Sequence, residues 1–204
     1  IMPFLMILGS VGFMFGTGGS ALIAKTMGEG DREKANRLFS LIVYVSAACG
    51  IVIAALGLVF IRPVAALLGA KDTMLDDCVT YGRIILLALP AYILQYEFQS
   101  FFVTAEKPQL GLAVTVAAGV TNIVLDALLV AVFPLGLSGA AAATAISQCV
   151  GGLVPLIYFG RPNSGLLRLG RAKYDGKALL KTCTNGSSEL MSNISMSVVS
   201  MLYN

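Results

Sequence analysis

Hydrophobic residues form five long runs along this sequence, and short polar segments separate them. Residues 1–24, 38–61 and 138–160 contain no Asp, Glu, Lys or Arg. Residues 84–105 and 110–137 contain one acidic residue each, Glu97 and Asp126. A helix needs about 20 apolar residues to cross the hydrocarbon core of a bilayer, and every run reaches that length. The pattern therefore predicts five membrane-spanning helices.

A sixth apolar stretch begins near Asn185 and continues to the last residue, Asn204. The first run is already apolar at Ile1, without the basic segment and the cleavage pattern of a secretory signal peptide. We therefore expect the sequence to be a fragment of a longer membrane protein.

Composition agrees with a membrane protein. Hydrophobic residues make up 57% of the chain and charged residues 12%, and the mean hydropathy is +0.84. A soluble domain has about 25% charged residues. The expected fold class is all-α, a polytopic membrane helix bundle. Histidine is absent and the four cysteines form no CxxC motif, so zinc ligation and histidine acid–base chemistry are excluded within these residues.

Lysine and arginine residues gather in alternate loops between the runs. The second loop and its flanks hold Arg62, Lys71 and Arg83, and the fourth loop holds none. All other basic residues lie in the first, third and fifth loops: Lys25, Arg32, Lys34, Arg37, Lys107, Arg161, Arg168, Arg171, Lys173, Lys177 and Lys181. The positive-inside rule predicts that these odd loops are cytoplasmic. The basic fifth loop also suits the anionic headgroups of membrane lipids.

Small residues are spaced for helix packing in the first run. Gly9, Gly12, Gly16 and Gly19 fall on one helical face and include a GxxxG pair, which predicts close approach of a neighbouring helix. The following GTGGSALIAKT lacks the spacing of a phosphate-binding loop, and we expect neither nucleotide nor nucleic-acid binding.

Polar residues line one face of the fourth run. Thr115, Gly119, Asn122 and Asp126 follow helical spacing, and Asp126 is deep in the apolar run. A carboxylate in hydrocarbon is costly and is usually functional. A structural Asp–Asn pair is the alternative, but a functional aqueous cavity accounts better for that cost.

Two further spans carry candidate polar residues. In the fifth run, Thr144 and Gln148 share a face, where they either pack against another helix or line the same cavity. In the third run, Pro90 predicts a kink. Glu97 follows it and is a secondary candidate: it forms an interhelical hydrogen bond, extends to the water interface, or takes part in coupling.

Several strings, in order, are similar to those of a known family. They are GTGGSALIAKTMGEGDREKA, AEKPQLGL, TNIVLDALLV, PLGLSGAAAATAISQ and NGSSELMSNISMSVVSMLYN. Together they resemble the multidrug and toxic compound extrusion (MATE) family over essentially the whole chain. The string QYEFQSFFVTAEKP is more similar to its DinF/MepA-like bacterial branch than to its NorM branch.

The resemblance implies a twelve-helix transporter made of two six-helix lobes. The five spans are then helices two to six, so residues 1–160 form most of the N-lobe. Residues 161–185 are a basic cytoplasmic connector, and residues 186–204 begin the first helix of the C-lobe, which is otherwise missing. Family members in the cell membrane export organic, often cationic, compounds in exchange for H⁺ or Na⁺. The implied location is the bacterial inner membrane.

The resemblance also assigns site residues. Asn122 and Asp126 match an asparagine and an aspartate of helix five in the N-lobe cavity, and Thr144 matches a cavity threonine of helix six. Thr115 and Gln148 are further cavity candidates. A proton, or Na⁺ held by Asp126 and Asn122, would neutralise the carboxylate, and a cationic drug would compete for it. No other metal and no cofactor are expected.

Two other readings remain open. A lipid-linked oligosaccharide flippase of the same superfamily would carry an anionic cargo, but no Lys or Arg lies inside the spans. A membrane scaffold is the non-transport alternative, although it would not need Asp126. An enzyme is not expected, because Asp126 and Asn122 provide neither a nucleophile with its base nor a metal cluster.

Overall fold

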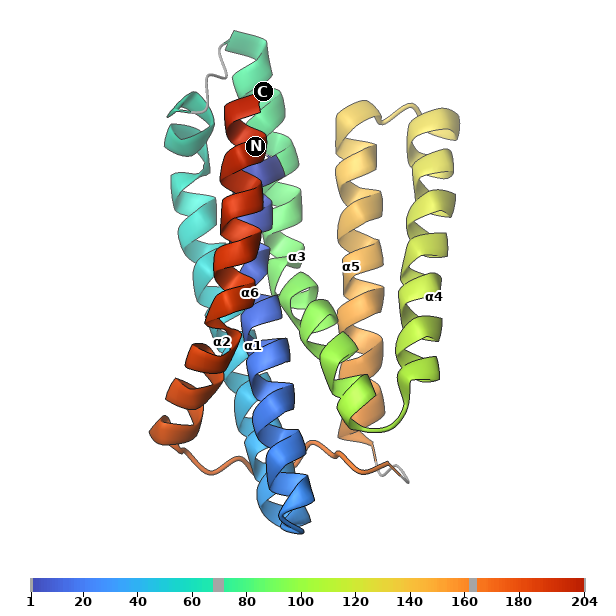
Figure 1. The fold of residues 1–204 in the computed structure, drawn as a ribbon. Coiled ribbons are helices and arrows are strands. Elements are labelled where there is room, and N and C mark those ends of the chain that lie inside the picture. The colour runs from blue at the N-terminus through green and yellow to red at the C-terminus, as the bar shows by residue number, and fades with distance from the viewer. Residues whose placement is uncertain (1, 68–71, 162–164, 204) are drawn as a thin grey trace.

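The computed structural model describes residues 2–67, 72–161 and 165–203, and this part of the chain contains helices and no strand. The helices, in order, are α1 (Met2–Gly28), α2 (Arg32–Leu67), α3 (Asp72–Thr104), α4 (Pro108–Asp126), the π-helix η1 (Ala127–Val132), α5 (Gly136–Gly160) and α6 (Gly176–Tyr203) (Figure 1). Five of them are long and apolar enough to cross a membrane, which confirms the all-α membrane bundle and the five predicted spans.

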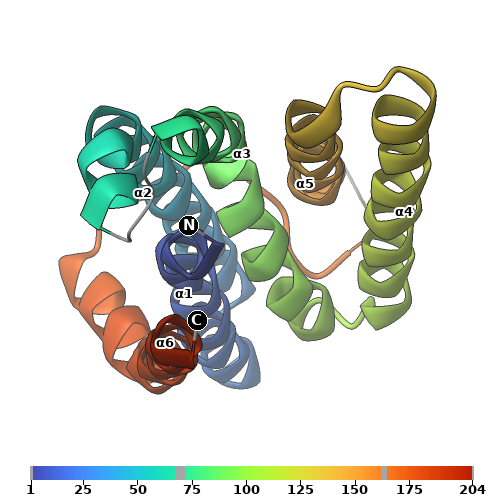
Figure 2. The same cartoon turned by 90° about the horizontal axis from the view of Figure 1, so that it is seen from above.

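The helices form two groups that share α3. Helices α1, α2, α3 and α6 pack together, whereas α4 pairs with α5 beside them (Figures 1 and 2). Helix α3 contacts both groups, and it bends near its middle, where Pro90 lies. Proline lacks the amide hydrogen that would bond to the preceding turn, so the predicted kink has a local cause.

The glycine face of α1 is the surface on which α3 packs. An ideal Cβ on Gly12 would lie 2.6 Å from the carbonyl oxygen of Ile93, and one on Gly16 would lie 3.1 Å from the Cα of Glu97. At Gly9 the ring of Tyr92 occupies the space of a side chain. The close approach predicted from the spacing is therefore present between α1 and α3.

A second close crossing, not predicted from the sequence, joins α1 to α6. Gly18 packs on the backbone of Thr182, and Gly186 packs on the backbone of Met14. The helix expected to start at residue 186 begins ten residues earlier, at Gly176. Its start is set by Asp175, whose Oδ1 accepts hydrogen bonds from the amides of Lys177 and Ala178 at 3.1 Å each.

An aromatic cluster joins α2, α3 and α5 near the end of the bundle where α1 turns into α2. Phe39 contacts Phe101 edge-on with ring centroids 5.0 Å apart, and Phe98 stacks on Phe159 at 5.5 Å. Leu167 of the connector is completely buried in the same cluster. The connector around Leu167 is therefore packed against the bundle.

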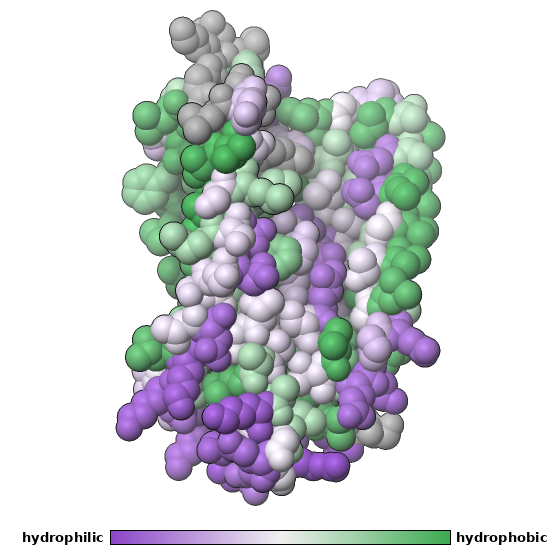
Figure 3. All heavy atoms as spheres, viewed as in Figure 1, coloured by the Kyte–Doolittle hydropathy of each residue, from purple (hydrophilic) through white to green (hydrophobic). Residues whose placement is uncertain are grey.

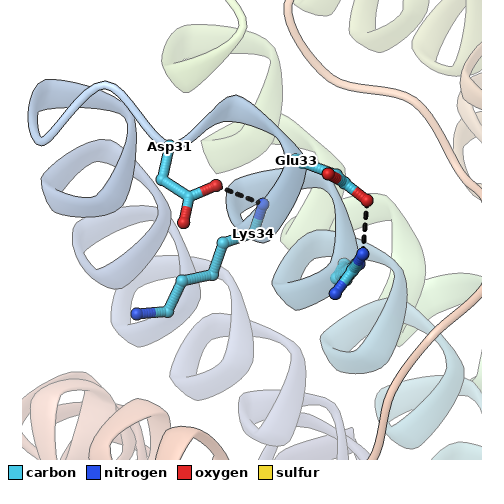
Figure 4. A network of polar contacts seen from close by, with 4 residues as sticks. Asp31, Glu33 and Lys34 are labelled. Carbon is cyan, nitrogen blue, oxygen red and sulfur yellow. Dashed lines mark hydrogen bonds and ion pairs between the residues drawn. The ribbon is translucent and has the colours of Figure 1, made fainter.

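The turn between α1 and α2 is closed by local polar contacts. Gly30 has a φ of +87°, a conformation that glycine adopts readily. Oδ1 of Asp31 accepts a hydrogen bond from the Lys34 amide at 2.9 Å, as expected for an N-cap, and Arg37 pairs with Glu33 one turn further on (Figure 4). Hydrophilic side chains gather at this end of the molecule, whereas strongly apolar side chains lie along the left and right edges of the view (Figure 3).

Candidate functional site

Asp126 is the last residue of α4, at the point where the helix changes its hydrogen-bond pattern. The next six residues form the π-helix η1, in which the Phe133 amide donates to the Leu128 carbonyl at 2.9 Å. Short π-helical segments are frequent at functional sites. Asp126 and Asn122 are both partly buried, and Nδ2 of Asn122 is buried without a hydrogen-bond partner among the described residues.

Tyr81 of α3 links the predicted residues of α4 and α5. Its side chain shares a hydrogen bond with Thr144 and lies near Asp126. Tyr81 is 8% exposed. The side chain is therefore turned into the protein.

A small cavity lies beside the Tyr81–Thr144 pair. It measures about 140 Å³, and its lining comes from α1, α3 and α5: Leu5, Met6, Tyr81, Ile85, Leu89, Tyr92, Thr144 and Gln148. The carbonyl oxygen Oε1 of Gln148 is buried and has no hydrogen-bond partner in the described part of the chain. The two α5 candidates, Thr144 and Gln148, therefore line one cavity, whereas Asn122 and Asp126 are not among its lining residues.

Aromatic rings continue from this cavity along α3. The rings of Tyr92 and Tyr96 are 4.8 Å apart and perpendicular, and Phe13 of α1 lies 4.1 Å from Tyr96. Tyr92 is itself part of the cavity lining. The tyrosines were not among the predicted site residues. The only sequence signal for them was their spacing of four residues on α3, which places them on one helical face.

Thr115 does not belong to this cavity. Its hydroxyl accepts a hydrogen bond from Nε2 of Gln99 at 3.3 Å and donates to the Gly111 carbonyl at 2.9 Å. Gln95 packs against Gly151 nearby, so these residues form a separate polar layer between α3, α4 and α5. Thr115 precedes Asp126 by about three helical turns, or about 16 Å along the axis. The predicted polar face of α4 is thus divided between two places, and much of α4 is exposed.

Glu97 is completely buried, with 0% exposure, and lies on the side of α3 that faces α2. Its Oε2 is in hydrogen-bond contact with the hydroxyl of Ser46, and its Oε1 has no partner among the described residues. The interhelical hydrogen bond was one of the expected arrangements. The alternative in which Glu97 extends to the water interface is wrong, because aromatic side chains and α2 enclose it.

A family model described as MatE matches residues 1–128, more than half of the chain. The chain belongs to the MatE family. This MatE chain is 32% identical to the multidrug export protein MepA of Staphylococcus haemolyticus (strain JCSC1435) over 165 residues, which are 81% of this chain and 36% of the relative. It is 28% identical to MepA of Staphylococcus saprophyticus subsp. saprophyticus over 204 residues, all of this chain and 45% of the relative.

The fold of the MatE chain is similar to that of solved transporters. An inward-facing multidrug resistance MATE family transporter of the MOP superfamily matches with a TM-score of 0.90 and 22% identity, over 96% of this chain and 45% of the other. The outward-facing form matches with a TM-score of 0.89 and 22% identity, over 97% and 44%. The chain spans less than half the length of its curated relatives.

Family membership and the five spans together make this a multi-pass plasma-membrane protein. Its relatives are named as export proteins and transporters, which agrees with the expectation that it is not an enzyme. The described residues contain no group of three or more His, Cys, Asp or Glu side chains that could hold a metal ion.

Proposed function

We propose that the complete protein is a secondary active antiporter that exports organic cations in exchange for H⁺ or Na⁺, with Asp126 as the carboxylate that binds each in turn. One observation carries this proposal. Asp126 lies near Tyr81, and Tyr81 shares a hydrogen bond with Thr144 at the wall of a cavity that Tyr81 and Tyr92 line. The site thus combines one negative charge, neutral oxygen ligands and aromatic surface.

The coupling step rests on the cost of an ionised carboxylate among apolar helices. Desolvation disfavours an ionised carboxylate. Either a proton or a bound cation neutralises the charge. Na⁺ prefers oxygen ligands, and the amide oxygen of Asn122 lies one helical turn before Asp126. Thr144 and Gln148 provide further oxygens at the cavity wall, of which the Gln148 carbonyl has no other partner in the described structure.

The aromatic lining suits a cationic, flat cargo. Tyrosine rings attract cations through their negative faces, and they stack on aromatic drugs. No lysine or arginine is among the residues that line the cavity. An anionic lipid-linked oligosaccharide would need such basic partners, so the flippase alternative has no support in this half of the protein. A scaffold would have no use for Asp126 at the end of a π-helical turn.

Alternating access would follow from movement of this half against the remainder of the protein. Inward- and outward-facing transporters match the chain equally well, with TM-scores of 0.90 and 0.89. Such similarity supports a half that changes little internally between the two states. Thr115 and Glu97 then serve the internal packing of this half, Thr115 with α3 and Glu97 with α2, rather than ion binding.

The proposed activity is tested with the full-length protein in proteoliposomes. A fluorescent organic cation is loaded, and its efflux is followed under a proton gradient alone, a sodium gradient alone, or neither. Acceleration by one gradient, with counter-movement of that ion, is expected and identifies the coupling ion. An efflux rate that depends on neither gradient, or transport of anionic dyes instead of cationic ones, would contradict the proposal.

A further inference from the structure

A groove opens between the end of α1, the start of α2 and the start of α6. It measures about 370 Å³ and is lined by Leu22, Lys25, Thr26, Glu29, Lys34, Leu38, Asp175, Lys177, Ala178 and Lys181. It lies at the hydrophilic end of the molecule, where the helices of the bundle terminate (Figure 3). The small cavity beside Tyr81 and Thr144 shares none of these residues.

Four lysines surround the groove: Lys25, Lys34, Lys177 and Lys181. All four are exposed, and the ion pairs of the described residues, Arg37–Glu33 and Arg62–Asp76, involve none of them. Of the two carboxylates in the lining, Asp175 already accepts two backbone amides at the start of α6. The four lysines therefore outnumber the two carboxylates of the lining, Glu29 and Asp175, and the groove keeps a net positive charge.

The floor of the groove includes apolar residues. Leu38 is 5% exposed and Ala178 is 7% exposed, and the buried hydroxyl of Thr26 donates to the Leu22 carbonyl at 2.9 Å. An inorganic anion would gain nothing from such a floor, whereas a lipid presents both a charged headgroup and apolar chains. Helix α1 ends at Gly28 and α6 begins at Gly176, so the lysines lie where spanning helices meet the headgroup layer.

We propose that this groove is a binding site for an anionic phospholipid of the cytoplasmic leaflet. Phosphate oxygens contact the lysine ammonium groups, and the glycerol and upper acyl carbons cover Leu22 and Leu38. Because Lys25 and Lys34 belong to the first two helices whereas Lys177 and Lys181 belong to α6, one lipid bridges the α1–α6 crossing and stabilises it. The basic loops predicted to be cytoplasmic then provide a defined binding site for one lipid, in addition to a general attraction for anionic headgroups.

The test uses the purified full-length protein in neutral detergent. Binding of phosphatidylglycerol is measured by native mass spectrometry and by the rise in melting temperature, with phosphatidylcholine of the same chains for comparison. The variant Lys25→Gln/Lys177→Gln/Lys181→Gln removes charge from the groove. The matched control Lys107→Gln/Arg161→Gln/Arg171→Gln removes three charges from the same membrane face but outside the groove.

The groove variant is expected to lose about tenfold in phosphatidylglycerol affinity and most of the thermal shift, while the control changes affinity less than about threefold. Equal losses in both variants, or equal binding of phosphatidylcholine, would overturn the proposal. Full protection by glycerol phosphate or inorganic phosphate alone would also overturn it, since a free anion would then suffice. If the triple variant melts early without lipid, Lys181→Gln alone is compared with Lys107→Gln, and the same outcomes decide.

Discussion

Ser46 of α2 and Glu97 of α3 are in hydrogen-bond contact, and both side chains are completely buried. The Ser46 hydroxyl also donates to the carbonyl of Val43 at 3.0 Å. A hydroxyl has a single proton to donate, so both contacts are satisfied when the carboxyl group carries a proton of its own. In that form Glu97 is a neutral acid that links two helices of the bundle.

Replacement of Glu97 by glutamine should therefore be tolerated. Glu97→Gln keeps a neutral donor beside Ser46, so we expect normal expression and retention of much of the efflux activity. Glu97→Ala leaves a buried hydroxyl and a cavity, which should lower the free energy of unfolding by about 2 kcal/mol or more. Thermal melting and dye efflux of the full-length variants measure both effects. Complete loss of efflux in well-expressed Glu97→Gln would make Glu97 a coupling residue.

The hydroxyl of Tyr81 should matter for transport more than for stability. Tyr81→Phe keeps the ring but removes the hydrogen bond with Thr144, whose hydroxyl retains its bond to the Ala140 carbonyl at 3.0 Å. We expect several-fold slower efflux and a stability loss of about 1 kcal/mol. Tyr174→Phe, at a side chain that is 80% exposed, is the control and should change neither. Unchanged efflux in Tyr81→Phe would show that the Tyr81 hydroxyl has no role in transport.

The α1–α3 contact should be sensitive to a single methyl group. In Gly12→Ala the new Cβ would lie 2.6 Å from the Ile93 carbonyl oxygen, a backbone atom that cannot move freely. We expect a stability loss of about 1–3 kcal/mol, measured as a lower melting temperature in detergent. Gly119→Ala is the matched control, because nothing lies within 4 Å of its Cβ position. Equal melting temperatures for both variants would refute close packing at Gly12.

The membrane orientation is tested by cysteine labelling of the full-length protein from which native cysteines have been removed. Lys173→Cys should resist an impermeant thiol reagent in intact cells, and Asp77→Cys should react, since both positions are exposed but belong to opposite ends of the spans. Permeabilised cells serve as the control in which both positions react. The reverse pattern in intact cells would invert the topology.

The spans and the close glycine packing were predictable because they depend on local pattern. The uncharged runs determine which segments span the membrane. The spacing of Gly9, Gly12 and Gly16 determines which face of α1 lacks side chains and allows close helix packing. Asp175 was present in the sequence too, but it was not recognised as the start of one helix that continues into the apolar stretch. Local patterns at such a helix start are weaker than a long apolar run, so the boundary was missed by ten residues.

The candidate site was only partly predictable because it depends on which helices become neighbours. Tyr81 precedes Thr144 by 63 residues, and nothing local indicates that α3 brings its ring to α5. Thr115 and Asp126 share a helical face, yet Thr115 contacts Gln99 of α3 whereas Asp126 lies near Tyr81 of α3. The sequence therefore placed Thr115 and Asp126 on the same face of α4. Tertiary packing determines which side chain each of them contacts.

The central claim is that the charge of Asp126 couples ion entry to drug exit. Asn122→Ala should weaken efflux less than Asp126→Asn, because it removes a neutral ligand and leaves the carboxylate. Asn122→Leu should be more harmful than Asn122→Ala, because it also excludes water beside Asp126. A purely structural aspartate would instead give poor expression and early melting in Asp126→Asn, with normal transport per folded molecule.

The most direct measurement is ion-driven efflux of a cationic dye from proteoliposomes that contain full-length Asp126→Asn. The amide keeps the shape and hydrogen bonding of the side chain and is easier to bury than a charge, so the variant should insert and fold normally. We expect Asp126→Asn nevertheless to lose gradient-driven efflux. Efflux at the wild-type rate with unchanged ion dependence would contradict it.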